Sequence, residues 1–238
     1  MPDDQTVAEH TLTLGGEEVR LLPERALFWQ RTATLIIADP HIGKASAFRA
    51  AAVAVPEGTT TADLDRLSQV IARCNAQNII ILGDLLHARS GRTAATLAAF
   101  AAWRERHANL DLMLVRGNHD ARAGDPPDAW GIACVDEPWQ VPPFVLRHHP
   151  ETLASGYTLA GHLHPAVRLT GAGRQRVTLP CFWFGAQVGV LPAFGSFTGA
   201  TVITPAPDDQ VFVIADDAVV AVSGASRGMA RASRGRRR

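Results

Sequence analysis

The sequence lacks the features that would place the protein in a membrane or in an oxidising compartment. None of its apolar runs approaches the ~20 consecutive residues that a membrane span needs, and the best candidate, 211–222, is interrupted by Asp216 and Asp217. Its start does not resemble a secretory signal. Three cysteines without a C-x-x-C pair indicate neither a disulfide framework nor a cysteine zinc site. We therefore expect a cytoplasmic protein with no membrane partner.

What is present is a large apolar fraction and an uneven distribution of charge. Of the 238 residues, 47% are hydrophobic, which is enough for one sizeable core. Six arginines fall within 227–238, so the rest of the chain has 17 basic and 23 acidic residues, a formal charge of −6. We predict a single domain over 1–226 and an Arg-rich, solvated tail over 227–238. Contact with a phosphate backbone is the alternative function of this tail.

Five short apolar runs each end in polar residues of the kinds that bind metals. The runs cover residues 34–38, 78–82, 110–115, 144–146 and 157–160. Continuous runs of this length are typical of strands buried on both faces of a sheet. The polar residues that follow them are Asp39-Pro40-His41, Gly83-Asp84, Gly117-Asn118-His119-Asp120, His148-His149 and Gly161-His162-Leu163-His164.

Helices are expected between the first three runs, at 59–75 and 93–107. The first has candidate threonine N-caps and one apolar face, made of Leu64, Leu67, Ile71 and Cys74. Strands separated by helices form βαβ units, which bind ligands outside the carboxyl ends of their strands. Further short strands are predicted at 11–14, 17–22, 167–169, 176–179, 187–191 and 211–215. The whole pattern predicts a sandwich of two sheets with helices outside.

Seven of the nine histidines lie in or directly beside these polar clusters, together with aspartates and an asparagine. Crowding such side chains at one sheet edge is costly unless a cation neutralises and coordinates them. Their nitrogen and oxygen donors suit Mn²⁺, Fe or Zn²⁺ better than Ca²⁺. We therefore expect a metal centre where the strand ends converge.

In this order, D-x-H, G-D, G-N-H-D, a strand-terminal histidine and G-H-x-H resemble the five motifs of the calcineurin-like metallophosphoesterase superfamily. The resemblance implies an α/β fold with four αββα layers, in which two mixed β-sheets are flanked by helices. It also implies a centre with two divalent metal ions. The first ion would be held by Asp39, His41, Asp84 and His164, and the second by Asp84, Asn118, His148 and His162.

Two cations that lie ~3.5–4 Å apart need a shared anionic ligand, which would be Asp84. Together they bind a phosphate diester, activate a water and stabilise in-line attack. The resemblance places His119 beside the leaving oxygen, as general acid or transition-state stabiliser, and makes Asp120 the residue that orients it.

Two histidine assignments stay open. His148 and His149 compete for one ligand position, and superfamily members with a similar His-x-Pro ending favour His148, which leaves His149 to contact the substrate or support the site. His87 is similar to a histidine that lies close to the scissile phosphate in the double-strand-break repair nucleases of this superfamily. The alternative for His87 is a solvent-facing residue at a helix start.

A closer resemblance extends over nearly the whole chain. Segments 39–44, 48–49, 55–60, 83–89, 179–183 and 190–195 are similar to the bacterial ligase-associated DNA damage response endonucleases. That family implies Mn²⁺-dependent cleavage of DNA with single-stranded character, in association with a helicase and a DNA ligase. Lys44 and Arg89 would then join His149 as contacts to the substrate.

Two other functions compete with a DNA endonuclease. The same centre could act on a small substrate such as a cyclic nucleotide or a phosphomonoester, because metal ligands alone do not set the substrate class. A non-catalytic scaffold of the same fold predicts loss of His119 or of a metal ligand, and the sequence retains all of these residues.

Overall fold

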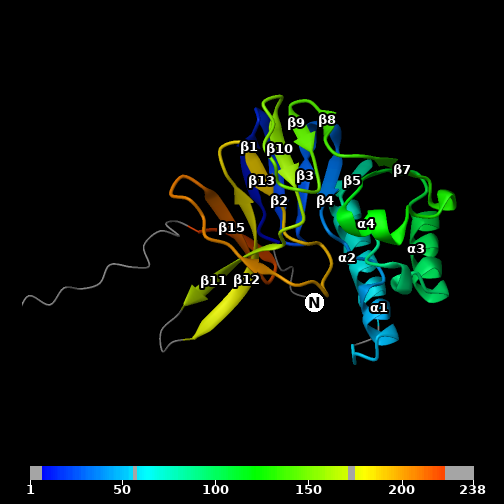
Figure 1. Ribbon diagram of the computed structural model, residues 1–238. Coiled ribbons are helices and arrows are strands. Elements are labelled where there is room, and N and C mark those ends of the chain that lie inside the picture. The colour runs from blue at the N-terminus through cyan, green and yellow to red at the C-terminus, as the bar shows by residue number, and fades with distance from the viewer. Residues whose placement is uncertain (1–6, 56–57, 171–174, 223–238) are drawn as a thin grey trace, which may run out of the picture.

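The computed structural model describes residues 7–55, 58–170 and 175–222, and two β-sheets packed face to face form its centre (Figure 1). The first sheet has seven strands in chain order: β1 (His10–Leu14), β2 (Glu17–Leu22), β3 (Ala26–Trp29), β4 (Thr34–Ile37), β5 (Asn78–Leu82), β6 (Asp111–Val115) and β7 (Ile132–Val135). Strands β1 to β4 pair in antiparallel fashion, whereas β4 to β7 are parallel.

The second sheet has nine strands: β8 (Trp139–Val141), β9 (Phe144–Leu146), β10 (Tyr157–Ala160), β11 (Pro165–Thr170), β12 (Arg176–Phe184), β13 (Val188–Val190), β14 (Thr201–Val202), β15 (Gln210–Ala215) and β16 (Ala218–Ala221). Strand β10 lies between β9 and β13, parallel to both. The long strand β12 pairs antiparallel with β11, β13 and β15. Both sheets are therefore mixed.

Strands β4 and β5 of the first sheet are buried on both faces, as their apolar runs predict. All four residues of β4 are buried. Leu35 and Ile37 pack into the core on the helix side, while Ile36 packs into the core between the sheets. Ile79 and Ile80 of β5 alternate in the same way. A strand turns successive side chains to opposite faces, so a continuous apolar run fills two cores at once.

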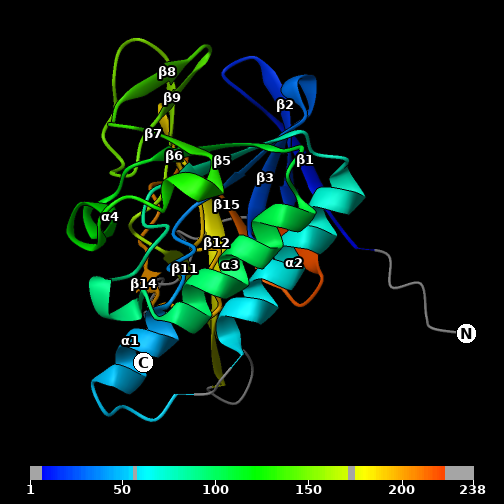
Figure 2. The ribbon, with the colours of Figure 1, turned by 90° about the vertical axis from the view of Figure 1, so that its right-hand side faces the viewer.

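Helices cover the outer face of the first sheet. The two long helices on this face are α2 (Thr59–Cys74) and α3 (Ala94–Arg106). The shorter α1 (Lys44–Ala50) and α4 (Asn118–Ala123) follow the ends of β4 and β6, and short 3₁₀ turns lie at η1 (Gln30–Thr32), η2 (Arg89–Gly91) and η3 (Asp128–Trp130). Figure 2 shows α2 and α3 side by side on this face. The predicted apolar face of α2 is buried. The prediction of a threonine N-cap for α2 is wrong, because Gly58 occupies the cap with a left-handed φ of 82° and no side-chain hydrogen bond closes the helix end.

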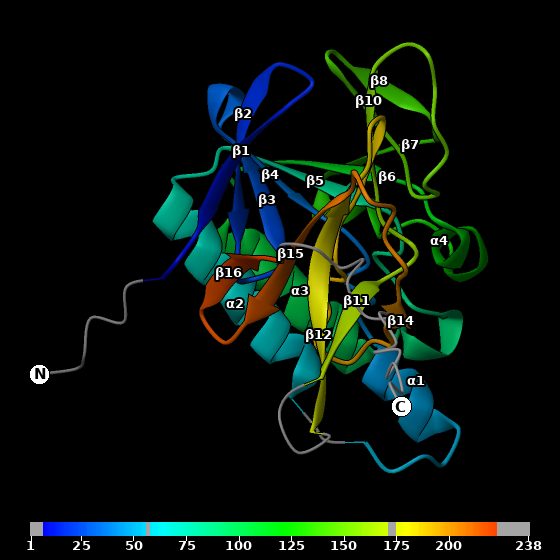
Figure 3. The same ribbon diagram turned by 90° about the vertical axis from the view of Figure 1, so that its left-hand side faces the viewer.

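The expected α/β sandwich of two mixed sheets is confirmed, but in the described residues the expected helical layer on the second sheet is missing, so the αββα arrangement lacks its fourth layer. Figure 3 shows the outer face of the second sheet, where β11, β12 and β15 lie toward the viewer. Within the described ranges no helix covers this face. A small apolar cluster of Val167, Cys181, Val211 and Val213 stabilises it instead.

Parallel pairing determines where the polar clusters meet. The chain leaves β4, β5 and β6 at the same edge of the first sheet, and it leaves β9 and β10 at one edge of the second. In the part of the chain that the structure describes, no helix is long and apolar enough to cross a membrane. The predicted tail over 227–238 lies outside the described residues.

Candidate metal centre

The Asp84 carboxylate, which follows β5, lies at the centre of the polar clusters. Its Oδ2 atom is 3.8 Å from Nε2 of His41, which follows β4, and 3.9 Å from Nε2 of His119, which follows β6. It is also 3.5 Å from Nε2 of His148, which the second sheet contributes after β9. The strand ends of both sheets therefore converge on one carboxylate, as the sequence predicts.

One group of ligand atoms lies on the side of Asp39. Ligand atoms of Asp39, His41 and His164 all lie within 4.8 Å of one another, and Asp39 Oδ1 is 3.5 Å from His164 Nε2. These last two atoms are buried, and neither has a hydrogen-bond partner within the described chain. Buried polar atoms are nearly always satisfied, by protein, water or an ion. A divalent cation between these atoms would satisfy both, so the residues fit a metal ion.

A second group lies around His148, on the other side of Asp84. Nε2 of His148 is 3.0 Å from Oδ1 of Asn118 and 3.0 Å from Nδ1 of His162. The His148 side chain is fully buried. Two imidazole nitrogens and an amide oxygen facing one point match the donor set that first-row divalent metals accept. Asp84 thus lies between two groups that could each hold a cation.

The structure distinguishes His148 from its neighbour His149. Nδ1 of His149 lies 2.6 Å from Oε1 of Glu137, whose other oxygen accepts the backbone N–H groups of both histidines at 2.8 and 3.0 Å. His149 also approaches His162, with 4.5 Å between the ring centroids. The Glu137 carboxylate holds the His149 ring, whereas the His148 ring points toward Asn118 and Asp84. Glu137 was not expected from the sequence, since no motif contains it.

The backbone at the centre adopts an unusual conformation. Five of the expected ligands have positive φ angles: Asp39 at 51°, His41 at 48°, Asp84 at 54°, His162 at 70° and His164 at 48°. A residue with a Cβ atom rarely occupies this left-handed region. Such conformations cluster at functional sites, where the surrounding structure holds them in place.

The glycines of three motifs are required by close packing against the ligands. A Cβ atom on Gly117 would lie 2.3 Å from Oδ1 of Asp84, and one on Gly161 would lie 2.6 Å from Oδ2 of Asp39. A Cβ atom on Gly83 would lie 2.1 Å from Nδ1 of His148. In the G-D, G-N-H-D and G-H-x-H motifs, the glycine therefore leaves the space in which a ligand side chain packs directly against the backbone.

Burial controls the charge of the centre. Loss of solvent, followed by the nearby Lys44 ammonium, lowers the pKa of His41 to about 2, so this ring is neutral and keeps a lone pair for a cation. Burial also lowers the pKa of His148. Burial, followed by repulsion from the Asp39 carboxylate, raises the pKa of Asp84 to about 6, although the hydrogen bond from the backbone N–H of His119 acts in the opposite direction.

Comparison with known proteins identifies the family. The family model for calcineurin-like phosphoesterases matches residues 33–177, which is more than half of the chain and includes the whole candidate centre. This chain belongs to the calcineurin-like phosphoesterase family.

Two solved structures resemble this calcineurin-like phosphoesterase to different degrees. The crystal structure of the Pseudomonas putida nuclease MPE is 42% identical and has a TM-score of 0.79, with 90% of this chain and 100% of that chain covered. The E. coli phosphoesterase Yfce is 15% identical with a TM-score of 0.37, and the match covers 77% of this chain and 88% of that chain. A search of curated proteins found no match. The first likeness agrees with the resemblance to the DNA damage response endonucleases.

His119 of this calcineurin-like phosphoesterase is held differently from the expectation. Nδ1 of His119 lies 2.7 Å from the carbonyl oxygen of His87, and 31% of the His119 side chain is exposed. Asp120 does not orient the ring, because its two oxygens accept backbone N–H groups from Asp84, Gly117 and Leu86. Asp120 instead fixes the loop that carries Asp84.

The remaining candidates lie at different distances from the centre. The His87 ring stacks on His119, with centroids 4.8 Å apart, and burial lowers its pKa to about 4. The half-buried Lys44 begins α1 beside His41. Arg89 is exposed and its Nε donates to the carbonyl of Arg122. Arg89 therefore connects η2 to α4, and the structure does not bring it into the cluster.

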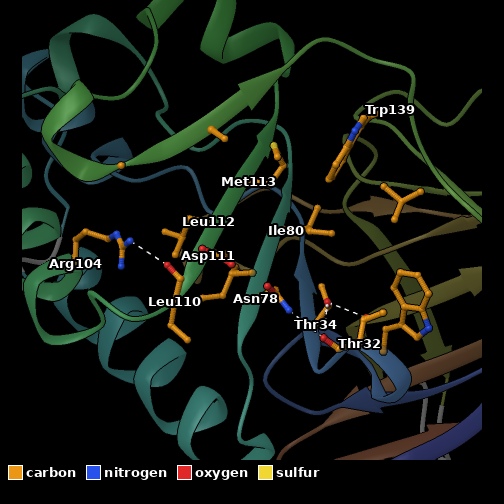
Figure 4. A pocket seen from close by; sticks show the side chains of 15 residues that line it. Thr32, Thr34, Asn78, Ile80, Arg104, Leu110, Asp111, Leu112, Met113 and Trp139 are labelled. Atoms are coloured by element: carbon orange, nitrogen blue, oxygen red, sulfur yellow. Dashed lines mark hydrogen bonds between the residues drawn. The ribbon is translucent and has the colours of Figure 1, made fainter.

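The calcineurin-like phosphoesterase also has a groove of about 530 Å³ at the opposite edge of the first sheet (Figure 4). Its lining includes the first residues of β4, β5 and β6, which are Thr34, Asn78 and Asp111, and the half-buried ring of Trp139. None of the candidate site residues lines this groove. The groove and the cluster of candidate metal ligands therefore lie at opposite edges of the first sheet. We assign the functional site to the ligand cluster, because it has the residues that can bind metal ions.

Proposed function

We propose that this calcineurin-like phosphoesterase is a DNA endonuclease that uses two divalent metal ions. The observation that carries the proposal is the buried Asp84 carboxylate between two groups of side chains that can each bind a cation. The 42% identity with a nuclease over 90% of the chain supports DNA as the substrate. We infer that the enzyme works in the cytoplasm, since Cys74, Cys134 and Cys181 are free thiols.

Asp84 would bridge the two ions. One ion would be held by Asp39, His41, Asp84 and His164, and the other by Asp84, Asn118, His148 and His162. When bound, two such cations polarise the phosphate and activate the attacking water. Mn²⁺ suits the mixed nitrogen and oxygen donors, and Fe or Zn²⁺ would bind the same set.

His119 supplies the proton that the leaving oxygen needs. A carbonyl oxygen can only accept a hydrogen bond, so Nδ1 of His119 carries a proton and donates it toward the oxygen of His87. Nε2 of His119 then faces the side of Asp84. In the imidazolium form this atom carries a second proton, which would pass to the leaving oxygen of the DNA and leave a neutral ring that keeps its Nδ1 proton.

Three further side chains lie beside the metal centre, where they could contact the DNA. Lys44 and His87 lie beside the centre on the side of His41, and His149 lies beside His162 on the other. These groups would bind the phosphates that flank the cut. We propose DNA with single-stranded character as the substrate, in functional association with a helicase and a DNA ligase.

The proposed function is tested with a covalently closed circle of single-stranded DNA. The circle has no ends, so only an endonuclease can cut it. With Mn²⁺ we expect the wild-type protein to linearise the circle and the Asp84→Ala variant to leave it intact. Bis-p-nitrophenyl phosphate serves as a parallel substrate for the metal centre alone. Hydrolysis of this small diester without any cut in the circle would contradict the proposal and favour a small natural phosphoester.

A further inference from the structure

Two half-buried aromatic rings meet beside the metal centre. Phe48 lies on α1 and Phe197 on the loop before β14, so the two come from distant parts of the chain. Their ring centroids are 5.5 Å apart with an interplanar angle of 87°. In such an edge-to-face pair, the ring that presents its edge keeps its own flat faces free.

The pair is connected to the catalytic histidine by a short series of rings. The Phe48 centroid lies 6.1 Å from that of His87. The His87 ring in turn stacks on His119, 4.8 Å away with an interplanar angle of 23°. Phe48 therefore lies two ring contacts, and Phe197 three, from the histidine that faces the leaving oxygen.

A positive charge lies one helical turn from Phe48. Lys44 and Phe48 are four residues apart on α1, and residues with this spacing lie on the same face of a helix. The chain contains no other lysine. The Lys44 ammonium is close enough to lower the pKa values of both His41 and His87, after the larger effect of burial. A cation and an aromatic ring on one helix face match a phosphate and the base attached to the same nucleotide.

We propose that Phe48 and Phe197 form a stacking site for an unpaired nucleobase next to the scissile phosphate, with Lys44 on the adjoining phosphate. This inference rests on the proposed function and specifies its substrate. A base in a duplex is already stacked and paired, so it must leave the helix before it can stack on a protein ring. A single strand needs no such step, and every base has a flat face that a phenylalanine ring accepts. The site thus selects unpaired DNA without reading its sequence.

The experiment compares diesters that differ only by one base. The p-nitrophenyl esters of thymidine 3′-phosphate and thymidine 5′-phosphate carry one base on a known side of the cut. Their abasic counterparts keep the sugar and the phosphate. For one of the two esters we expect the wild-type KM to be about tenfold lower with the base than without it.

Phe48→Leu keeps an apolar side chain but removes the flat ring. We expect it to raise the KM of that thymidine ester about tenfold and to leave the KM of the abasic ester and both kcat values unchanged. Phe197→Leu should also raise the KM of the thymidine ester. Phe48→Trp, which keeps a flat ring, should have a KM as low as that of the wild-type protein. Trp139→Leu is the matched control, because it removes a half-buried aromatic ring from the distant groove (Figure 4). It should change neither KM.

The outcomes separate this inference from the proposed function. If the wild-type KM is the same with and without the base for both esters, or if Phe48→Leu and Phe197→Leu keep the wild-type difference, the stacking site is contradicted even though DNA is cut. If the wild-type protein cuts neither the esters nor the DNA circle, the proposed function itself fails. Thermal unfolding and metal content of each variant show that the fold and the metal centre are intact.

Discussion

Asp84 has a left-handed backbone and a side chain that is only 3% exposed. A left-handed residue with a Cβ atom costs about 1–3 kcal/mol, and a buried carboxylate costs more unless a positive charge compensates it. Asp39 combines the same two features. Asp39 and Asp84 keep these conformations because the surrounding backbone packs closely against their side chains. Motif glycines allow this close packing.

The role of these glycines is tested with Gly161→Ala. Because the new Cβ atom would lie 2.6 Å from Oδ2 of Asp39, the Asp39 carboxylate must shift from its position beside the other ligands. We expect the variant to bind Mn²⁺ about 10–100-fold more weakly, as for other disturbed supports of metal ligands. Isothermal titration with Mn²⁺ measures the change. Gly199→Ala is the control, since its Cβ atom would meet no atom within 4 Å, and an equal loss of affinity in both variants would contradict the packing argument.

The proton donor is tested with His119→Ala. We expect this variant to lower kcat on DNA by about 10²–10⁴-fold while both metal ions stay bound. The reduction should be smaller on bis-p-nitrophenyl phosphate, because nitrophenolate leaves without a proton. Steady-state rates on the two substrates, with metal content measured in parallel, provide the comparison. An equal reduction on both substrates would exclude His119 as the general acid.

At the scale of elements, the sequence predicts the strands that bury a continuous apolar run and the helix that buries one full apolar face. The strand runs at 34–38 and 78–82 and the buried face of α2 are confirmed because burial on both sides leaves a periodic or continuous apolar pattern. The elements that the sequence did not predict are short: β3, β7, β8, β14, β16, α1 and α4. Only tertiary contacts define such elements, and a pattern over two to seven residues does not distinguish strand from helix.

The candidate site, too, could be predicted from the sequence only in part. Motifs predict which side chains gather, since they follow parallel strands that end at one edge. They do not predict Glu137 beside His149 or the carbonyl of His87 beside His119, because these contacts depend on where loops cross. The expected pairing of Asp120 with His119 is wrong for that reason.

The contribution of α2 to stability is tested with Leu67→Ala. Leu67 is buried on the face of α2 that packs against the first sheet, so the variant loses apolar contact and leaves a cavity. We expect the free energy of unfolding to fall by about 2–5 kcal/mol. Gln69→Ala, at an exposed position on the same helix, should change it by less than about 0.5 kcal/mol. Urea unfolding measures both, and similar values would show that α2 is not anchored by this face.

At the scale of the whole molecule, the centre joins the two sheets. Asp39, Asp84 and Asn118 follow strands of the first sheet, whereas His148 and His162 follow strands of the second. A cation that contacts both sets would hold the sheets together at this edge. Metal binding should therefore stabilise the entire fold.

This coupling is tested by thermal unfolding with and without Mn²⁺. A ligand present at 100 times its Kd stabilises the native state by about 2.7 kcal/mol, so Tm should rise on addition of Mn²⁺ and fall again with a chelator. Asp84→Ala should reduce the shift strongly. A wild-type Tm that does not respond to Mn²⁺ would show that the cation does not connect the sheets.

The most direct measurement for the central claim is the number of Mn²⁺ ions bound per chain at saturation. Equilibrium dialysis followed by elemental analysis gives this number for the wild-type protein and for three variants. We expect two ions in the wild-type protein, about one in His41→Ala and in His148→Ala, which each lack a ligand of a different ion, and a loss at both positions in Asp84→Ala. A wild-type protein that binds a single ion, or an Asp84→Ala variant that still binds two, would contradict a centre bridged by Asp84.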